Sequence, residues 1–179
     1  MSRPRLLWAA ALFSAALLGP ATAAAARCSG ATARPTAATL ARQAAATLCL
    51  VNEARAAHGL APLRAVPALA RAARAHAQEM VRADVFSHTG IDGSTPSQRI
   101  TRTGYLGGAS SWKVGETIAW GSGRQAAPAA IVRGWLRSAE HRAILLDGRY
   151  RDLGVGIALG APGLSGSAAT VTADLGARR

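Results

Sequence analysis

The residues that could do chemistry fall in three short segments of the chain. Phe86-Ser87-His88 and Gly115-Glu116-Thr117 each hold one such residue, and His141 lies in the segment Ser138-Ala139-Glu140-His141-Arg142. The chain has only four histidines and nine acidic residues, so these side chains stand out from its background. Imidazole and carboxylate groups serve as general bases and as metal ligands. His88, Glu116 and His141 are therefore the candidate residues of a catalytic or binding site.

These three residues could bind a metal, act in acid–base catalysis or have a purely structural role. The two imidazoles of His88 and His141 could bind a divalent metal such as zinc, with Glu116 as a ligand or as the group that orients a ring. Alternatively, Glu116 could orient an imidazole that acts as a general base on water. A buried network of the same groups could instead join loop, strand and helix without any turnover. The sequence has no Gly-x-Ser-x-Gly motif, no third clear metal ligand and no reactive cysteine, which favours binding or structure over catalysis.

The start of the chain predicts export. Arg3 and Arg5 precede an apolar stretch from Leu6 to Leu18, and small residues follow Gly19-Pro20. This is the pattern of a signal peptide, and the apolar stretch is short for a membrane span. We expect residues 1–26 to be removed and the secreted, extracellular protein not to span a membrane.

Charge and cysteine content narrow the class of protein further. The 21 basic residues outnumber the nine acidic ones, but they are scattered, so in an exported chain they do not indicate nucleic-acid binding. Attraction to an anionic cell envelope remains open. Cys28 and Cys49 are the only cysteines, and we predict a disulfide between them in an oxidising compartment. It would close a loop of about twenty residues and contribute roughly 3 kcal/mol to stability.

Hydrophobic periodicity indicates the elements that must position the candidate residues. Helical spacing runs over 37–58, from Pro67 to about Asp84, over 95–103 and over 125–136, and Ser138 can cap a further short helix. Strand character appears over 112–120, 153–159 and 169–175. Helices followed by a short antiparallel sheet predict one α+β domain, and no repeat or second domain is visible.

Several motifs occur in an order that resembles the bacterial branch of the CAP superfamily (cysteine-rich secretory, antigen-five and pathogenesis-related proteins). The matching segments lie between residues 46 and 176; they are Leu50–Arg55, Gly59–Leu63, His76–Met80, Phe86–His88, Arg99 with Gly104-Tyr105, Val114–Ala119, Trp135–Leu145, Tyr150–Gly156 and Asp174–Gly176. The resemblance implies an α-β-α sandwich with a shallow central cleft. It divides the chain into a signal peptide (1–26), a leader with the start of the first helix (27–45) and the domain (46–176).

The family's cleft holds two histidines and two glutamates, and three of these positions match here. The resemblance assigns His88 and His141 to the histidines and Glu116 to the first glutamate, although Thr117 replaces the usual asparagine. Ser138 stands where the second glutamate belongs, and Glu140 is expected to point elsewhere on its helix. A mechanism that requires both acids is therefore doubtful for this chain.

The sequence thus predicts a secreted CAP-domain protein that binds a ligand at His88, Glu116 and His141. The ligand classes left open are a lipid or other small apolar molecule, a metal ion and a component of the cell envelope. A cofactor is not required. The alternatives are a His/Glu-dependent or metal-assisted hydrolase, such as a peptidase, and a structural or interaction module at the envelope.

Overall fold

The structure, a computed structural model, describes residues 27–179, apart from the side chains of residues 165 and 166. The predicted signal peptide lies outside the described residues. Within residues 27–179, no helix is both long and apolar enough to cross a membrane.

The helices lie close to the predicted positions, except for a later start of α5. The first is α2 (Leu40–Ala57), preceded by the short 3-10 helix η1 (Ala37–Thr39). The others are α3 (Pro67–Ala83), α4 (Pro96–Arg102), α5 (Pro128–Arg137) and α6 (Ala139–Leu145). Three of them start with proline, whose missing N–H costs nothing at the first helical position. The helix expected over 125–136 starts later than predicted, at Pro128. The residues before it, Gly123–Ala126, form the 3-10 helix η2 instead.

A four-stranded sheet forms the middle of the protein. Its strands are β1 (Arg64–Ala65), β2 (Trp112–Ser122), β3 (Asp152–Ala161) and β4 (Leu164–Arg178), in the order β1-β3-β4-β2. The pairs β3–β4 and β2–β4 are antiparallel, as expected. The structure adds two features to the predicted antiparallel sheet. The strand β1 was not predicted and pairs in parallel with β3, and β4 extends over 15 residues.

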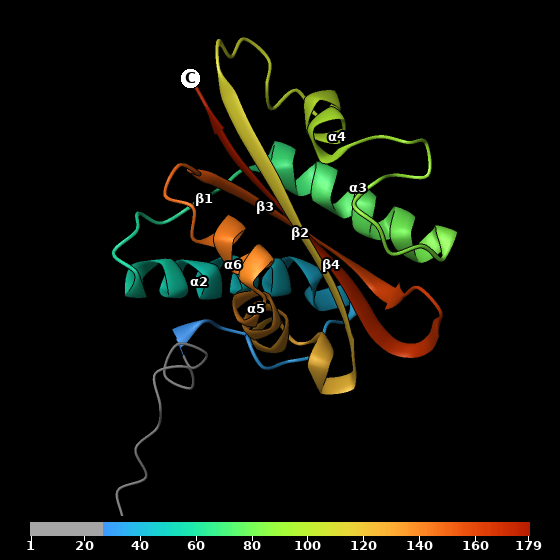
Figure 1. The fold of residues 1–179 in the computed structure, drawn as a ribbon. Helices are drawn as coiled ribbons and strands as arrows, with labels where there is room; N and C mark the ends of the chain where they lie inside the picture. Colours follow the sequence, from blue (N-terminus) through green and yellow to red (C-terminus); the bar gives the residue numbers. More distant parts are fainter. Residues whose placement is uncertain (1–26) are drawn as a thin grey trace, which may run out of the picture.

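Helices cover both faces of this sheet (Figure 1), which confirms the α-β-α architecture. On one side α2, α5 and α6 lie together, and on the other α3 and α4. The helix α3 lies directly against the sheet, because a Cβ atom on Gly154 or Gly156 would collide with the backbone of α3. Glycine is needed there for close approach.

The main core lies between the sheet and the α2–α5–α6 layer. Alternate residues of β3 and β4 enter it together with Trp135 of α5; these strand residues are Leu153, Val155, Ile157, Val171, Ala173 and Leu175. Since successive strand residues point to opposite faces, the intervening residues of β4 and of β2 face α3 and α4. Glu116 and Asp174 belong to that second set and are opposite each other in the β2–β4 pairing.

The first helix is fixed by covalent and polar contacts. The predicted disulfide between Cys28 and Cys49 is confirmed, with Cα atoms 5.7 Å apart. Asn52 exchanges two hydrogen bonds with the backbone of Leu63. The fully buried Arg55 donates to the carbonyls of residues 61, 145 and 147. These contacts tie α2 to the loops around it.

Candidate histidine–glutamate site

Glu116 is the centre of the candidate site. It lies in the middle of β2, which is the edge strand of the sheet, and it is only 4% exposed. Its Oε1 accepts a hydrogen bond from Nδ1 of His88 at 2.7 Å, and its Oε2 accepts one from Arg99, also at 2.7 Å. An ionised carboxylate can only accept, so Nδ1 of His88 carries the proton and Nε2 is left as the free acceptor. We call His76, His88, Arg99, Glu116 and Asp174 the Glu116 cluster.

Arg99 reaches Glu116 because of how α4 begins. The Thr95 hydroxyl accepts a hydrogen bond from the backbone N–H of Gln98, and the Gln98 side-chain oxygen accepts one from the backbone N–H of Thr95, which fixes the first turn. Arg99 lies in this turn, is 8% exposed and also donates to the carbonyl of Ser94. Its Nε is buried and has no hydrogen-bond partner among the described residues.

His76 of α3 supports the loop that carries His88. It is 1% exposed; one of its ring nitrogens lies 2.8 Å from the carbonyl oxygen of Ser87, and the other lies 3.0 Å from a carboxylate oxygen of Glu79. Both nitrogens thus face acceptors, an arrangement that a cationic ring satisfies completely. The same ring lies 3.9 Å from Glu116. His76 is therefore a satisfied buried histidine, and it also belongs to the site.

The two buried carboxyl groups titrate in opposite directions. Burial alone would raise the pKa of Glu116, but the hydrogen bond from His88 and the charge of Arg99 outweigh it, so this pKa is lowered. Asp174 is 1% exposed, and its pKa is raised well above the usual value by burial and by the negative charge of Glu116. Glu116 is thus the ionised partner, and Asp174 holds its proton over a wider pH range.

His141 lies close to this group without joining it directly. It comes from α6, whose first turn is capped by the Ser138 side chain, which accepts from the backbone N–H of His141 at 3.5 Å. Burial lowers the pKa of His141, and nearby His88 lowers it further, so the ring is neutral over more of the pH range. Its Nδ1 is buried and has no partner within the described part of the chain. The structure thus joins His88 directly to Glu116 and places His141 beside them.

The neighbouring residues of α6 follow the expectations for a helix start. Ser138, which stands where the family's second glutamate belongs, acts as the cap. Glu140 is exposed in the first turn, where the helix dipole favours a negative charge.

Sequence reasoning missed three members of the cluster. His76, Arg99 and Asp174 were noted only as parts of family-like motifs. Arg99 needs an acidic partner because it is buried, but its burial is visible only in the structure. Asp174 carried a usable signal, because it is the one charged residue in the segment predicted as a strand over 169–175. Only the pairing of β2 with β4 shows that this signal leads to Glu116.

A family model of the cysteine-rich secretory proteins, called CAP, matches residues 48–172 of the chain. The chain belongs to the CAP family. Two curated relatives come from Bacillus subtilis (strain 168): the uncharacterized protein YkwD, 32% identical over 108 residues, and the uncharacterized membrane protein YlbC, 36% identical over 110 residues. These matches cover 60% and 62% of this chain but only 39% and 30% of the relatives, which are much longer.

Solved structures of bacterial proteins show the same fold. An extracellular protein with an SCP domain from Bacillus anthracis matches with a TM-score of 0.60 at 25% identity, over 78% of this chain and 43% of that one. An outer surface protein from Borrelia burgdorferi matches with a TM-score of 0.60 at 21% identity, over 74% and 90% of the two chains. A cysteine-rich secretory protein from Staphylococcus aureus has a TM-score of 0.54 at 18% identity, over 78% and 40%.

The residues of this CAP domain do not form a complete metal site. Within residues 27–179, no group of three or more His, Cys, Asp or Glu side chains is arranged to hold a metal ion. Of the two histidines considered as ligands, His88 already uses Nδ1 for Glu116. Two imidazoles without a third ligand fall short of the three protein ligands typical of catalytic zinc. We therefore derive no chemical step through a metal.

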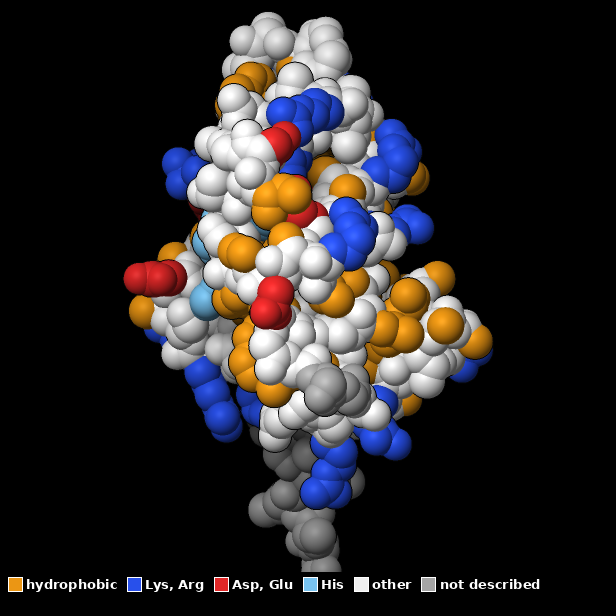
Figure 2. Space-filling view, turned by 90° about the vertical axis from the view of Figure 1, so that its right-hand side faces the viewer, with side chains coloured by type: hydrophobic (Ala, Val, Ile, Leu, Met, Phe, Trp, Pro, Cys, Tyr) orange, Lys and Arg blue, Asp and Glu red, His pale blue; other side chains and the backbone are white. Residues whose placement is uncertain are grey.

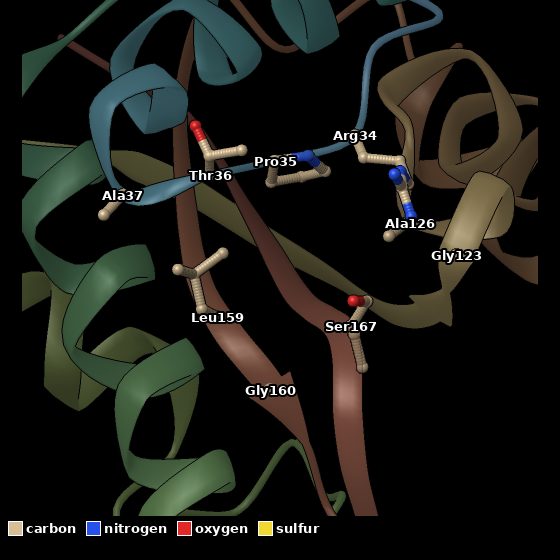
Figure 3. Close-up of a pocket in the computed structure, with 10 residues that line it drawn as sticks. Arg34, Pro35, Thr36, Ala37, Gly123, Ala126, Leu159, Gly160 and Ser167 are labelled. Carbon is tan, nitrogen blue, oxygen red and sulfur yellow. The ribbon is translucent and has the colours of Figure 1, made fainter.

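A separate hollow of about 370 Å³ lies where the leader crosses the end of the sheet (Figure 3). Its lining shares no residue with the Glu116 cluster and consists mainly of small side chains, with Pro35 and Leu159 facing each other across it. Arg34 is the only ionisable residue of this lining, which therefore offers no acid–base pair for chemistry.

Proposed function

We propose that this CAP protein binds a small, partly apolar ligand outside the cell, with His88 as its polar contact. One observation carries the proposal: a half-exposed imidazole, fixed from behind by a buried carboxylate, has exposed aromatic side chains on the neighbouring strand and loop. Such a surface combines one oriented hydrogen-bonding group with apolar area, which is the usual composition of a small-molecule site.

The polar half of the site is rigid and ready to bind. Both oxygens of Glu116 are occupied, so the carboxylate is not free to contact a ligand itself. The His88 side chain is 51% exposed and its Nε2 can accept a hydrogen bond from a ligand hydroxyl or amide. His141, neutral through its lowered pKa, adds a second ring beside it.

The apolar half comes from aromatic residues that remain exposed. Trp112 and Trp120 lie on the same face of β2 as Glu116, four residues to either side, which corresponds to about 13 Å along the strand. They are 53% and 44% exposed, and Phe86, two residues before His88, is 44% exposed. Exposed aromatic side chains that lie in one region of a protein often mark a binding surface.

Three observations support an extracellular location. The disulfide between Cys28 and Cys49 is typical of oxidising compartments. The first residues have the pattern of a signal peptide, and the similar Bacillus anthracis protein is described as extracellular.

Binding of a neutral fluorescent probe, N-phenyl-1-naphthylamine, tests the proposal without involving charge. We expect saturable fluorescence enhancement with the purified protein. Trp112 and Trp120 lie about 26 Å apart along the strand, so one probe molecule contacts only one of them. Of the single variants Trp112→Ser and Trp120→Ser, one should therefore weaken binding about twofold to tenfold, because a lost aromatic contact removes roughly 0.5–1.5 kcal/mol beyond its area. The variant His88→Ala should weaken it less.

A matched control uses an exposed apolar residue away from the site. Leu164 is 44% exposed, as Trp120 is, and Leu164→Ser should leave probe affinity unchanged. Equal losses in the control and in the tryptophan variants would contradict a localised site, as would the absence of saturable binding.

A hydrolase remains the second candidate because of one feature. Glu116 holds the proton of His88 at Nδ1 and leaves Nε2 exposed, which is how a carboxylate orients a general base. In this mechanism Nε2 takes a proton from water while the water oxygen attacks a peptide carbonyl carbon. The C–N bond then breaks, and Nε2 gives the proton to the leaving amine. Cleavage of a broad peptide library by the wild type that disappears in His88→Ala would support this candidate. Cleavage that survives Glu116→Gln would contradict it. Failure of both probe binding and hydrolysis would leave an interaction module at the envelope.

A further inference from the structure

A groove of about 260 Å³ lies between α3 and α4, behind the Glu116 cluster. Its lining includes four arginines, Arg71 and Arg82 of α3 and Arg99 and Arg102 of α4. Figure 2 shows basic side chains distributed over this face of the molecule, in its upper and its lower half. The groove therefore presents more positive charge than a random stretch of surface.

The acidic residues of the groove are already engaged. Asp92 accepts from Arg102 at 2.8 Å and from the backbone N–H of Ser94. Glu79 lies against His76. Arg71 makes a single hydrogen bond, to the carbonyl of Thr103, which leaves most of its donors available. The positive charge of the groove is thus only partly compensated.

A buried donor points to a missing ligand. Arg99 lines the groove, and only 8% of its surface is exposed. Its Nε is nevertheless without a hydrogen-bond partner within the described part of the chain. Its two terminal nitrogens are occupied by Ser94 and Glu116. A buried, unpaired guanidinium N–H costs free energy unless an acceptor reaches it.

We propose that the groove between α3 and α4 binds a phosphate group, and that Arg99 couples its occupancy to Glu116 and His88. Guanidinium groups bind phosphate oxygens through paired, charge-assisted hydrogen bonds. Arg71 and Arg82 supply charge at the rim, and Arg99 supplies the buried donor. Because the same guanidinium holds Oε2 of Glu116, a phosphate at Nε shifts the group that orients His88.

Phosphate binding to the groove does not depend on the proposed function. The coupling of phosphate binding to His88 does rest on the proposed function, because His88 is the polar contact of the proposed ligand. The phosphate could be a free ion or the headgroup of an anionic lipid, which share the same oxygens. Calorimetric titration with inorganic phosphate and sedimentation with vesicles of phosphatidylglycerol, compared with phosphatidylcholine, separate these sources. Both measurements are made at constant ionic strength, because exposed charges are screened by salt.

The decisive variant removes the two rim arginines, Arg71→Gln/Arg82→Gln. We expect a loss of affinity of at least tenfold for the source that binds. The control, Arg133→Gln/Arg137→Gln, removes the same charge from exposed positions on α5, on the other side of the sheet. It should leave the affinity within twofold.

The coupling is measured on the histidine rings by NMR. Phosphate should shift the ring resonances of His88 in the wild type, and this shift should disappear in Arg71→Gln/Arg82→Gln. His58, whose ring binds the carbonyl of Ala54 at the end of α2, should not respond.

Several results would overturn the proposal. Binding of neither phosphate nor phosphatidylglycerol vesicles would remove the groove as a site. Equal losses in the α3 and α5 double variants would show attraction by net charge alone. Specific binding without a response of His88 would remove the coupling. None of these results depends on the neutral probe, so failure of the proposed function is recognised separately.

Discussion

The two faces of the sheet use the same strands for opposite purposes. Facing α2, α5 and α6, the strands contribute mainly apolar side chains, among them Leu153, Val171 and Leu175, to one continuous core, and Thr117 of β2 is a buried polar exception. Facing α3 and α4, neighbouring positions of β2 and β4 carry Glu116, Thr172 and Asp174, all buried. Strand alternation keeps these two environments one residue apart.

The comparison shows where stability and chemistry come from in this fold. The apolar face gains free energy from burial without any partner requirement. The polar face is costly to bury unless each group finds a partner, and several of its atoms do not: Thr172 Oγ1 and Asp174 Oδ1 have none within the described residues. A protein keeps such groups in its interior where they position a site.

The largest expected effect belongs to the apolar face. Leu175 is fully buried, and Leu175→Ala would leave a cavity in the main core. We expect a loss of about 2–5 kcal/mol in the free energy of unfolding. Urea unfolding followed by circular dichroism measures it. A loss below about 1 kcal/mol would contradict the assignment of stability to this face.

An intermediate effect is expected from Asp174, and it depends on pH. Because its pKa is raised in the fold, its contribution is fully present below the unfolded value of about 3.9 and is lost as the pH rises toward the folded pKa. Over that interval stability should fall by up to about 1.4 kcal/mol per pH unit. Asp174→Asn, which resembles the protonated acid, should abolish this slope.

Glu116 contributes to stability in a different pH range from Asp174, so the two carboxyl groups can be compared within one protein. Its pKa is lowered, so its contribution is present above the unfolded value of about 4.3 and is lost as the pH falls below that value. Unfolding free energies measured from pH 3 to pH 7 on the wild type and Asp174→Asn distinguish the two. An unchanged slope above pH 4 in Asp174→Asn would show that this carboxyl is ionised in the fold.

The smallest effect is expected from Thr172 on the polar face. Thr172→Val replaces a buried hydroxyl that has no partner among the described residues by a methyl group of similar size. Removing an unsatisfied polar atom should change stability by less than about 1 kcal/mol, toward greater stability. Thermal unfolding of Thr172→Val and Leu175→Ala under the same conditions measures the two changes in stability. A loss as large as that of Leu175→Ala would remove the distinction between the faces.

Much of this protein could be predicted from local sequence signals. Helix starts at Pro67 and Thr95, the cap at Ser138 and the disulfide between Cys28 and Cys49 follow from local chemistry, and the structure shows each of them. The two-residue strand β1 escaped prediction because it is too short to have a period, and it exists only by pairing with β3. The start of α5 was misplaced because the η2 turn has no signal distinct from a helix.

The sequence by itself determined the family, the order of the elements and the side chains able to do chemistry. His88 and Glu116 were visible as isolated reactive residues, because such types are rare in this chain. Only the tertiary structure decided how they are used. The pairing of β2 with β4 places Asp174 beside Glu116, and the packing of α3 and α4 brings His76 and Arg99 to the same carboxylate. Electrostatic effects depend on distances of a few ångströms between residues far apart in the chain, and no local pattern contains those distances.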